Sequence, residues 1–501
     1  MTQRRSLVPA TVLAALVGPA TLFAQPSGAT NLPSDSASGP TNLRYKGVSI
    51  TPIGFFAAEG FYRQRTQQAD VPSSFNAIPF THTAQGQLSE FRASARQSRL
   101  GVLGEGRLSD VTATGYFEGD FLSAGITSNS NESNSYTFRV RQFWAQAAFK
   151  NGFTFTGGQM WSLLAGNRAG IVTRGEYIPS TIDAQYVPGF NWARQFGARL
   201  TYRANRNVSV AASIEEPQTT FRSSGTLNPT VTLVNTLAGG SALNPNVNYS
   251  TDVAPDAIVK LALDQPGVAH FEVKALGRMF RDRIYTVIPA TTTGGTATNG
   301  GATNYTTTGG GVGASLFLPI QKVVDIGLNG LYGRGIGRYG TSQIADATLN
   351  AQGQVVPIRA AHGLATIDLH ATPALDIYAY GGAEYAYRAA DVNTAAKGVG
   401  YGSALLNNTG CETELLPMST SAPATGSCFA DTRMVSQGTG GFWYRFYRGT
   451  RGTVQFGAQY SHTERSTWSS NATATAVTGG SRVQPLATEN MVYTSFRYYL
   501  P

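Results

Sequence analysis

Arginine is the residue type whose spacing in this chain most clearly suggests chemistry. Several arginines stand two or four residues apart, which puts both side chains on one face of an extended strand. The candidates are Arg92 with Arg96, Arg139 with Arg141, the cluster Arg278, Arg281 and Arg283, and the separate Arg445 and Arg497. Guanidinium groups hold carboxylates or phosphates through paired hydrogen bonds, and rings of arginine select anions. We expect Arg96, Arg139 and Arg141 to line a polar passage. The alternative is that some of these arginines lie at a rim, where they bind lipid headgroups or pair with acids.

One long segment between strand-like stretches, 164–193, carries charges of both signs. They are Arg168, Arg174, Glu176 and Asp183. If the segment folds inward, it narrows the passage and sets both signs opposite the wall arginines. Such a transverse field favours zwitterionic or anionic solutes. The alternative is a loop that lies over the mouth of the passage or against a neighbouring subunit.

The elements that carry these residues are predicted from a regular alternation of short and long gaps. The short gaps lie at 107–110, 150–152, 203–207, 264–267, 319–322, 372–374 and 449–452. The long gaps lie near 65–89, 123–135, 164–193, 217–254, 285–308, 335–358, 389–438 and 465–489. Eight long and seven short gaps predict sixteen strands, with both chain ends at the short-turn side. A membrane-spanning barrel sorts its loops in this way, with short periplasmic turns and long extracellular loops.

The two faces of the strand-like segments differ in chemistry. In 111–121 one parity carries Val111 and Phe117, and the other carries Glu118 and Asp120. The same alternation recurs at 269–276, 324–332, 361–370 and in the last strand. Charges in the middle of strands are tolerated where they face a water-filled lumen. Because an open sheet edge in hydrocarbon leaves backbone groups unpaired, the first strand (48–62) must pair with the last (490–500). The predicted fold is an all-β, 16-stranded antiparallel transmembrane β-barrel over 45–501.

The N-terminal sequence predicts where such a barrel resides. Arg4 and Arg5 precede an apolar stretch and small residues that end at Ala24, which predicts a secretory signal peptide over 1–24. Its removal changes the formal net charge to +9 − 2 = +7. Residues 25–44 are rich in serine, proline and glycine and predict a flexible linker. No apolar run long enough for a spanning helix follows the signal peptide. We therefore expect the outer membrane of a Gram-negative bacterium.

The two cysteines, Cys411 and Cys428, both lie in the long gap 389–438. In a secreted chain this placement predicts a disulfide. The alternative, a metal site or a catalytic thiol, has no companion ligands nearby in the sequence.

Other motifs point to no cofactor, no metal and no catalytic residue. His362, Asp368 and His370 share one face, but solvated wall residues explain them better than a metal site does. The G-x-G-x-x-G match at 335–340 opens a glycine-rich loop without the helix that a dinucleotide site requires. The arginines are dispersed along alternating strands, so we expect no nucleic acid partner.

Two runs, RQSRLGVLGEG (96–106) and RVRQFWAQAAFKNGFTFTGGQMWSLL (139–164), together with the loop that follows, resemble the trimeric porins of Gram-negative outer membranes, and most closely the DcaP-like group. The resemblance covers most of 45–501. It implies a homotrimer, and a loop after the fifth strand that folds into the lumen. It thereby implicates Arg168, Arg174, Glu176 and Asp183 on the loop and Arg96, Arg139 and Arg141 on the wall. DcaP-like channels are associated with dicarboxylates and other small anions. Two features depart from the pattern: 25–44 has no heptads, and the chain ends in Leu500-Pro501 rather than an aromatic residue.

These observations lead to the hypothesis of a porin, a passive diffusion channel for small hydrophilic, anionic (dicarboxylate-like) solutes. Outer-membrane lipid and lipopolysaccharide are the expected surroundings. An outer-membrane enzyme such as a phospholipase is the alternative from another class, although no fitting acid or Ser/His spacing is present. An energy-coupled receptor needs a plug domain that 25–44 is too short to form. A structural or adhesive barrel would conduct no ions.

Overall fold

The computed structural model describes residues 43–123, 137–222, 224–228, 231–233, 252–288, 298–412, 414, 428–471 and 482–501. The predicted signal peptide (1–24) and residues 25–42 of the predicted linker lie outside these residues. Leu43 and Arg44, also assigned to the linker, belong to a short strand, β1 (Leu43–Tyr45).

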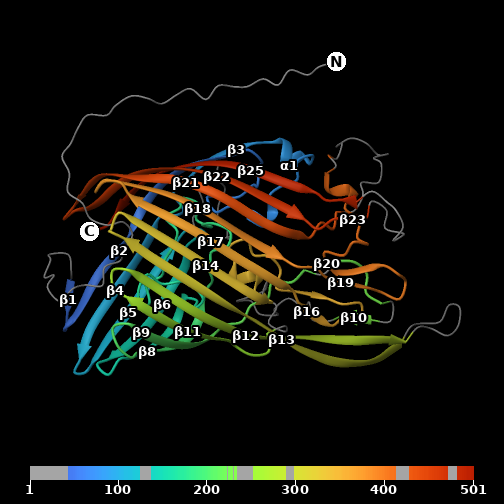
Figure 1. The fold of residues 1–501 in the computed structure, drawn as a ribbon, viewed down its shortest axis with the longest axis horizontal. Helices are drawn as coiled ribbons and strands as arrows, with labels where there is room; N and C mark the ends of the chain where they lie inside the picture. Colours follow the sequence, from blue (N-terminus) through green and yellow to red (C-terminus); the bar gives the residue numbers. More distant parts are fainter. Residues whose placement is uncertain are drawn as a thin grey trace, which may run out of the picture.

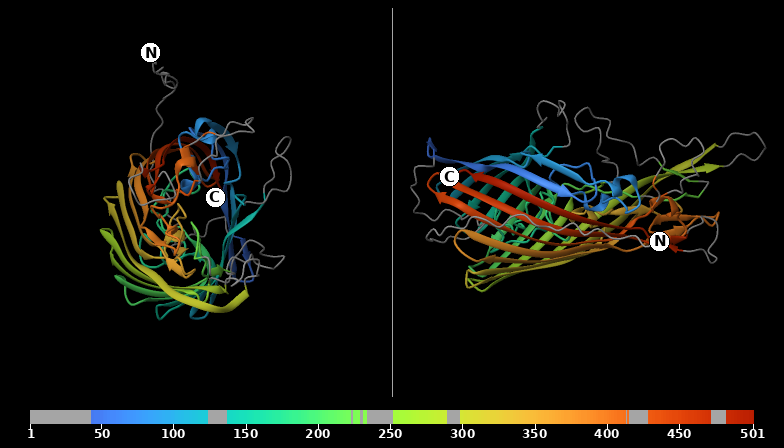
Figure 2. Two further views of the ribbon diagram at one scale, coloured as in Figure 1. Left: turned by 90° about the vertical axis from the view of Figure 1, so that its right-hand side faces the viewer. Right: turned by 90° about the horizontal axis from the view of Figure 1, so that it is seen from above.

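The described residues form a closed barrel of 16 antiparallel strands (Figure 1, Figure 2), which confirms the predicted fold class. In barrel order these are β2 (Val48–Arg63), β3 with β4 (Glu90–Ser94, Arg99–Leu108), β5 (Val111–Asp120), β6 (Arg139–Phe149), β7 (Phe153–Trp161), β8 (Arg194–Arg203), β9 (Val208–Glu215), β11 (Asp256–Gln265), β12 (Ala269–Ile288), β13 (Thr298–Ile320), β14 (Val324–Arg334), β17 (Arg359–His370), β18 (Leu375–Ala386), β21 (Thr432–Gly449), β22 (Gly452–Thr467) and β25 (Leu486–Tyr499). β3 and β4 share one position in the barrel, because both pair with β2.

The barrel closes where the first strand meets the last, as predicted. β2 pairs with β25 in antiparallel register from Phe55 opposite Tyr499 to Arg63 opposite Met491. Every strand of the cylinder thus has two neighbours, so no backbone edge is left unpaired at the depth of the hydrocarbon.

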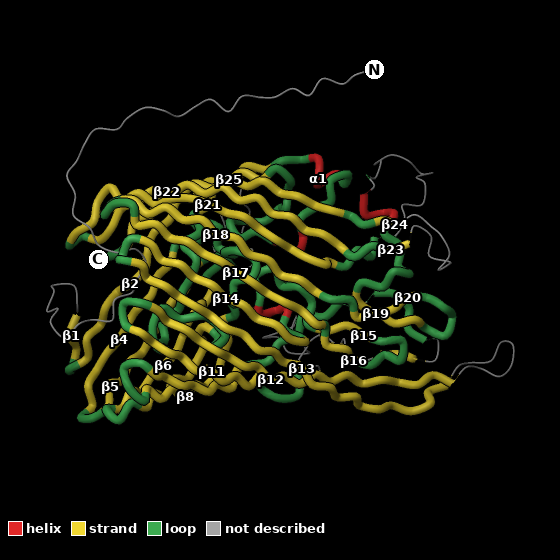
Figure 3. The backbone as a smooth tube through the Cα atoms, viewed as in Figure 1, coloured by secondary structure: helices red, strands yellow, loops and turns green. Residues whose placement is uncertain are grey.

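The shorter elements lie at the ends of the cylinder or in its loops (Figure 3). They are β1, which pairs with β2; β10 (Val231–Leu233), which pairs with β12; the hairpins β15/β16 (Ala347–Leu349, Val355–Pro357), β19/β20 (Ala389–Val392, Gly398–Tyr401) and β23/β24 (Ser470–Asn471, Arg482–Val483); the helix α1 (Ala84–Gln87); and the 3-10 turns η1 (Phe75–Ala77), η3 (Gly337–Tyr339) and η4 (Thr409–Glu412). Among the described residues, no helix is long and apolar enough to cross a membrane.

The turns fall where the sequence predicts them, but three long gaps are narrower in the structure than the sequence predicts. All seven short gaps join successive barrel strands. The gap expected at 285–308 is mostly strand, because β12 continues to Ile288 and β13 begins at Thr298. β21 already begins at Thr432, inside the gap expected at 389–438. Residues 465–467 and 486–489 likewise belong to β22 and β25. Residues 298–308 at the start of β13 are mostly glycine, threonine and asparagine, so they lack the apolar alternation that marks a strand in lipid.

The two faces of the strands separate as predicted. On β5 the side chains of Glu118 and Asp120 are buried inside the barrel. On other strands, large apolar side chains of the outward-facing parity are about half exposed on the outer surface, among them Leu328 on β14 and Ile367 on β17. An outer surface of this kind suits lipid rather than water.

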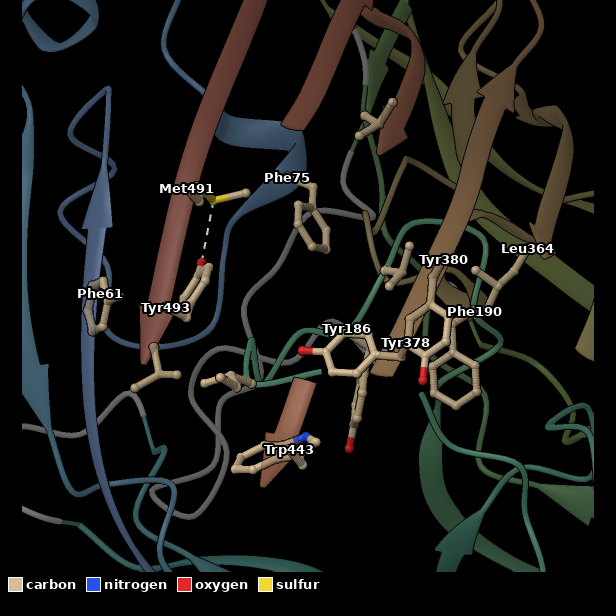
Figure 4. Packing of buried hydrophobic residues seen from close by; sticks show 14 of the residues in the cluster. Phe61, Phe75, Tyr186, Phe190, Leu364, Tyr378, Tyr380, Trp443, Met491 and Tyr493 are labelled. Carbon is tan, nitrogen blue, oxygen red and sulfur yellow. Dashed lines mark hydrogen bonds between the residues drawn. The ribbon is translucent and has the colours of Figure 1, made fainter. Parts of the chain in front are cut away.

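The barrel interior is not uniformly polar. Side chains from the loop 162–193 and from the first long loop pack against inward-facing aromatic residues of β2, β18, β21 and β25 (Figure 4). The cluster includes Tyr186 and Phe190 on the loop, Tyr378 and Tyr380 on β18, and Trp443 on β21. This apolar packing fills part of the cross-section and fixes the position of the loop within the barrel.

A candidate constriction between one loop and an arginine wall

The loop between β7 and β8 folds into the barrel and is fastened to the far wall. The Trp443 indole N–H donates to the Ser180 carbonyl oxygen at 2.8 Å, and the Ser180 amide donates to the Tyr380 hydroxyl at 3.1 Å. Further along, the Ile182 amide donates to Gln459 Oε1 at 2.6 Å. These bonds join the loop to β18, β21 and β22. The inward path, one of the two alternatives left open by the sequence, is therefore the one observed.

Two buried lysines hold the first part of this loop. Lys260 Nζ donates to the Ala165 carbonyl at 2.6 Å, and Lys274 Nζ donates to the Leu164 carbonyl at 2.6 Å. Glu272, which pairs with Lys260 at 3.1 Å, accepts the Asn167 amide at 3.0 Å. All three charged side chains are almost completely buried. Because buried charges are stable only when paired and hydrogen-bonded, this arrangement commits the loop start to one position. We call Lys260, Lys274 and Glu272 the lysine latch.

The opposite wall carries an array of arginines and carboxylates on β4, β5 and β6. Arg141 is 3% exposed and donates to Glu118 Oε1 and to Asp120 Oδ2, both at 2.8 Å. Arg139 holds both oxygens of Asp120, at 2.9 and 2.8 Å. Arg99 lies 3.5 Å from Glu118. Three guanidinium groups therefore share two carboxylates.

A β-bulge on β6 follows the inward-facing Arg139 and Arg141 and changes which of the later residues point inward. The register shifts between Glu118 and Gly119, so that Arg141 is the extra residue on β6. After the bulge the parity changes, and Phe143 points outward while Trp144 points inward. Strict alternation would have placed Phe143 on the arginine face.

The loop meets this wall at Tyr186. Arg141 Nη2 donates to the Tyr186 hydroxyl at 3.3 Å, and Tyr186 has a positive φ of 69°. Burial alone raises the pKa of the Tyr186 phenol, but the guanidinium groups of Arg141, Arg194 and Arg99 outweigh burial and lower the pKa below its ordinary value. Guanidinium groups therefore dominate the electrostatic surroundings of the Tyr186 hydroxyl.

Two more arginines stand at this contact. Arg174, on the loop, lies over the ring of Tyr116 at 4.7 Å. Arg194, the first residue of β8, lies over the rings of Trp161 at 4.6 Å and Trp192 at 5.7 Å. Its side chain is partly exposed, and among the described residues its guanidinium has no carboxylate or other hydrogen-bond partner. Cation–π contacts orient the group without neutralising its charge.

The spacing of arginines in the sequence does not indicate Arg99 and Arg194. The only signal for Arg194 was its place directly after the charged segment 164–193. Arg99 is the first residue of β4. Which residues of β4 face inward cannot be predicted unless it is known that residues 95–98 separate it from β3.

The other wall candidates form no ion pair with Glu118 or Asp120 among the described residues, although Arg96 lies close by and donates to the Phe121 carbonyl at 2.8 Å. Arg92 and Arg96 are near the long-loop end. Arg92 donates to the Ala69 carbonyl at 3.2 Å, and Arg96 pairs with Asp70 at 3.2 Å. Arg278 is buried between Asp256 and Asp346, at 3.1 Å from each. Arg445 pairs with Asp376 near the short-turn end.

Of the remaining loop candidates, Arg168 and Asp183 are bound to other parts of the barrel interior, and Glu176 is buried. Arg168 pairs with Asp325 on β14 at 3.2 Å. Asp183 accepts the Ser73 amide and the Tyr493 hydroxyl, each at 3.1 Å, and burial raises its pKa. Glu176 is also buried, which raises its pKa although Arg199 acts to lower it. Of the four loop charges, only Arg174 contacts the arginine wall.

The disulfide prediction is confirmed, since Cys411 and Cys428 are bonded. His362, Asp368 and His370 do not converge: His370 pairs with Asp376 at 2.9 Å, whereas neither ring nitrogen of His362 has a partner among the described residues. In the part of the chain that the structure describes, no cluster of three or more histidine, cysteine or acidic residues could hold a metal ion.

No protein-family model and no curated protein matches the sequence. Among solved structures, the outer membrane channel DcaP of Acinetobacter baumannii aligns with a TM-score of 0.58 at 16% identity, over 92% of this chain and 100% of that chain. The two chains share a fold. The fold expected from the DcaP-like resemblance is therefore confirmed. OmpT of Vibrio cholerae (12% identity, TM-score 0.45, 91% and 99% coverage) and an anion-selective porin from Comamonas acidovorans (10%, 0.44, 90% and 100%) are less similar.

Proposed function

We propose that this chain is an outer-membrane porin, a passive diffusion channel for small hydrophilic solutes that prefers anions. The observation that carries the proposal is the contact between loop and wall. There Arg99, Arg139, Arg141, Arg174 and Arg194 gather around two carboxylates, Glu118 and Asp120. A passage with an excess of guanidinium groups concentrates anions and repels cations.

The cellular location and assembly are part of the same proposal. The apolar outer surface supports a membrane site, and the predicted signal peptide supports export to the outer membrane. The short turns then face the periplasm and the long loops face the exterior. The homotrimer remains an expectation from the DcaP-like resemblance.

Dicarboxylates are the solute class that fits best. Arg194 lies over the ring of Trp161 at 4.6 Å, that ring packs edge-on against Tyr186, and the Tyr186 hydroxyl accepts from Arg141, so the two guanidinium groups belong to one cluster. A solute with two carboxylates can interact with the wall and with Arg194 together. The solute class therefore rests on this geometry and on the DcaP-like resemblance.

Solute-induced swelling of liposomes that contain the purified protein tests the function. We expect swelling in a small neutral sugar and faster swelling in succinate than in a dication of similar size. Empty liposomes are the control. Absence of swelling in every solute would reject a porin, and faster entry of the dication would reject the anion preference.

A further inference from the structure

A second group of arginines lies on the outer surface of the barrel, outside the channel. Arg334 ends β14 and Arg359 begins β17, and the two are directly opposite in the register. Both side chains are exposed. They face outward with Tyr332, which shares the parity of Arg334 and is 46% exposed. Like charges directly opposite on a sheet repel each other. Among the described residues, no carboxylate forms an ion pair with either guanidinium.

Aromatic rings connect this pair to two more arginines. Arg359 lies over the ring of Tyr387 at 4.1 Å, and Tyr387 packs edge-on against Tyr385 at 4.7 Å. Tyr385 in turn contacts Trp468 at 5.9 Å.

Trp468 carries arginines on its ring as well. Arg388 lies at 4.6 Å and Arg433 at 5.9 Å from its centroid. Within the described residues, Arg433 Nε is buried without a hydrogen-bond partner. We call Arg334, Arg359, Arg388, Arg433, Tyr387 and Trp468 the arginine–aromatic patch.

The patch lies about one membrane thickness from the short-turn end. β14 has 11 residues and β17 has 12, and a transmembrane strand needs about 9–11 residues to cross the hydrocarbon. Arg334 and Arg359 are at the far ends of these strands. The outward residues between them and the short turns, such as Leu328 and Ile367, are apolar. Tyrosine and tryptophan are typical of the boundary between hydrocarbon and headgroups. The patch is therefore at headgroup depth on the long-loop side.

We propose that the arginine–aromatic patch binds the phosphate groups of a phosphorylated glycolipid in the outer leaflet of the membrane. A phosphate between Arg334 and Arg359 would convert their repulsion into paired, charge-assisted hydrogen bonds. The rings of Tyr387 and Trp468 hold the guanidinium planes while the acyl chains of the lipid pack on the apolar surface below. The inference depends on the membrane orientation in the proposed function and is independent of the channel's selectivity.

Native mass spectrometry of the full chain in detergent tests the site. The probes are a diphosphorylated glucosamine disaccharide lipid and the same lipid without phosphates. The variants are Arg334→Gln/Arg359→Gln and the matched control Arg107→Gln/Arg206→Gln, which removes two exposed arginines near the short-turn end. We expect the patch variant to lose about tenfold or more in apparent affinity for the phosphorylated lipid, and the control to keep the wild-type affinity. Ion selectivity should be the same in all three proteins.

Three results would overturn the proposal. One is equal retention of the phosphorylated lipid by the patch variant and the control. Another is equal binding of the two lipids by the wild-type chain, a comparison that needs no variant to fold. The third is displacement of the lipid by millimolar inorganic phosphate, which would indicate a site for free phosphate.

Discussion

At the scale of single residues, the constriction depends on which arginines are neutralised. Arg139 and Arg141 carry the sequence signal, but both are paired with carboxylates of their own wall. Arg194 has no such partner among the described residues and is held only by aromatic rings. Whether Arg139 and Arg141 are paired with carboxylates depends on which residues of β5 and β6 lie opposite one another. The bulge at Glu118 sets that register, and the alternation along either strand does not reveal it.

Replacing Arg194 should therefore reduce anion preference more than replacing Arg139. In Arg194→Gln an uncompensated positive charge is lost, whereas Arg139→Gln leaves Asp120 paired with Arg141. We expect the chloride-to-potassium permeability ratio to fall roughly twofold or more in the first variant and less in the second, by reversal potential in planar bilayers. A larger effect of Arg139→Gln would show that the ion pairs, rather than the unpaired charge, set selectivity.

Arg141 should matter most for stability. Arg141→Gln leaves the buried Glu118 with the Tyr116 hydroxyl at 2.8 Å and Arg99 at 3.5 Å, so we expect a loss of about 2 kcal/mol in urea-induced unfolding from lipid vesicles. The double variant Glu118→Gln/Arg141→Gln removes both charges and should recover part of that loss. Additive effects of the two substitutions in a double-mutant cycle would contradict the pairing.

At the scale of elements, the inward loop is the part that gives the barrel its narrow point. Its start is held by the lysine latch and its middle by Trp443, Tyr380 and Gln459. The sequence indicated the loop through its length and mixed charges. It could not indicate the latch, because Lys260 and Lys274 look like ordinary polar-face residues until the loop carbonyls are placed against them.

Removing the latch should loosen the loop. Lys260→Met/Lys274→Met deletes the lysine donors to the Ala165 and Leu164 carbonyls and leaves Leu164 with only the longer bond from Asn191 Nδ2 at 3.4 Å. We expect larger current fluctuations in single-channel recordings, with the barrel still folded. The matched control is Lys397→Met, an exposed lysine in a loop. Quiet traces identical to wild type would mean that the aromatic attachments alone hold the loop.

The disulfide should act locally. Cys411 is buried with Ile78, Phe80 and Ala487, which links two long loops to the end of β25. Reduction, or Cys411→Ser/Cys428→Ser, should speed proteolysis in 389–431 and leave ion selectivity unchanged, because the arginine wall lies elsewhere. A change in reversal potential on reduction would place this loop in the conducting path.

At the scale of the whole molecule, turn chemistry and face alternation predict the barrel and its closure, because both follow from the requirement that lipid meets no unpaired backbone. The same reasoning fails outside the apolar part. The glycine- and threonine-rich start of β13 is strand, but its residues do not alternate between apolar and polar types, so the sequence predicts a loop there. The sequence also does not reveal the aromatic packing inside the barrel. The aromatic residues that hold the loop have the same strand parity as the inward-facing charged residues.

The reversal potential of the wild-type channel under a potassium chloride gradient tests the central claim most directly. An excess of guanidinium groups at the contact between loop and wall predicts a potential with the sign of the chloride equilibrium potential, and a smaller magnitude at high ionic strength, where charges are screened. A potential with the sign of the potassium equilibrium potential would contradict the assignment of that contact as the selective constriction.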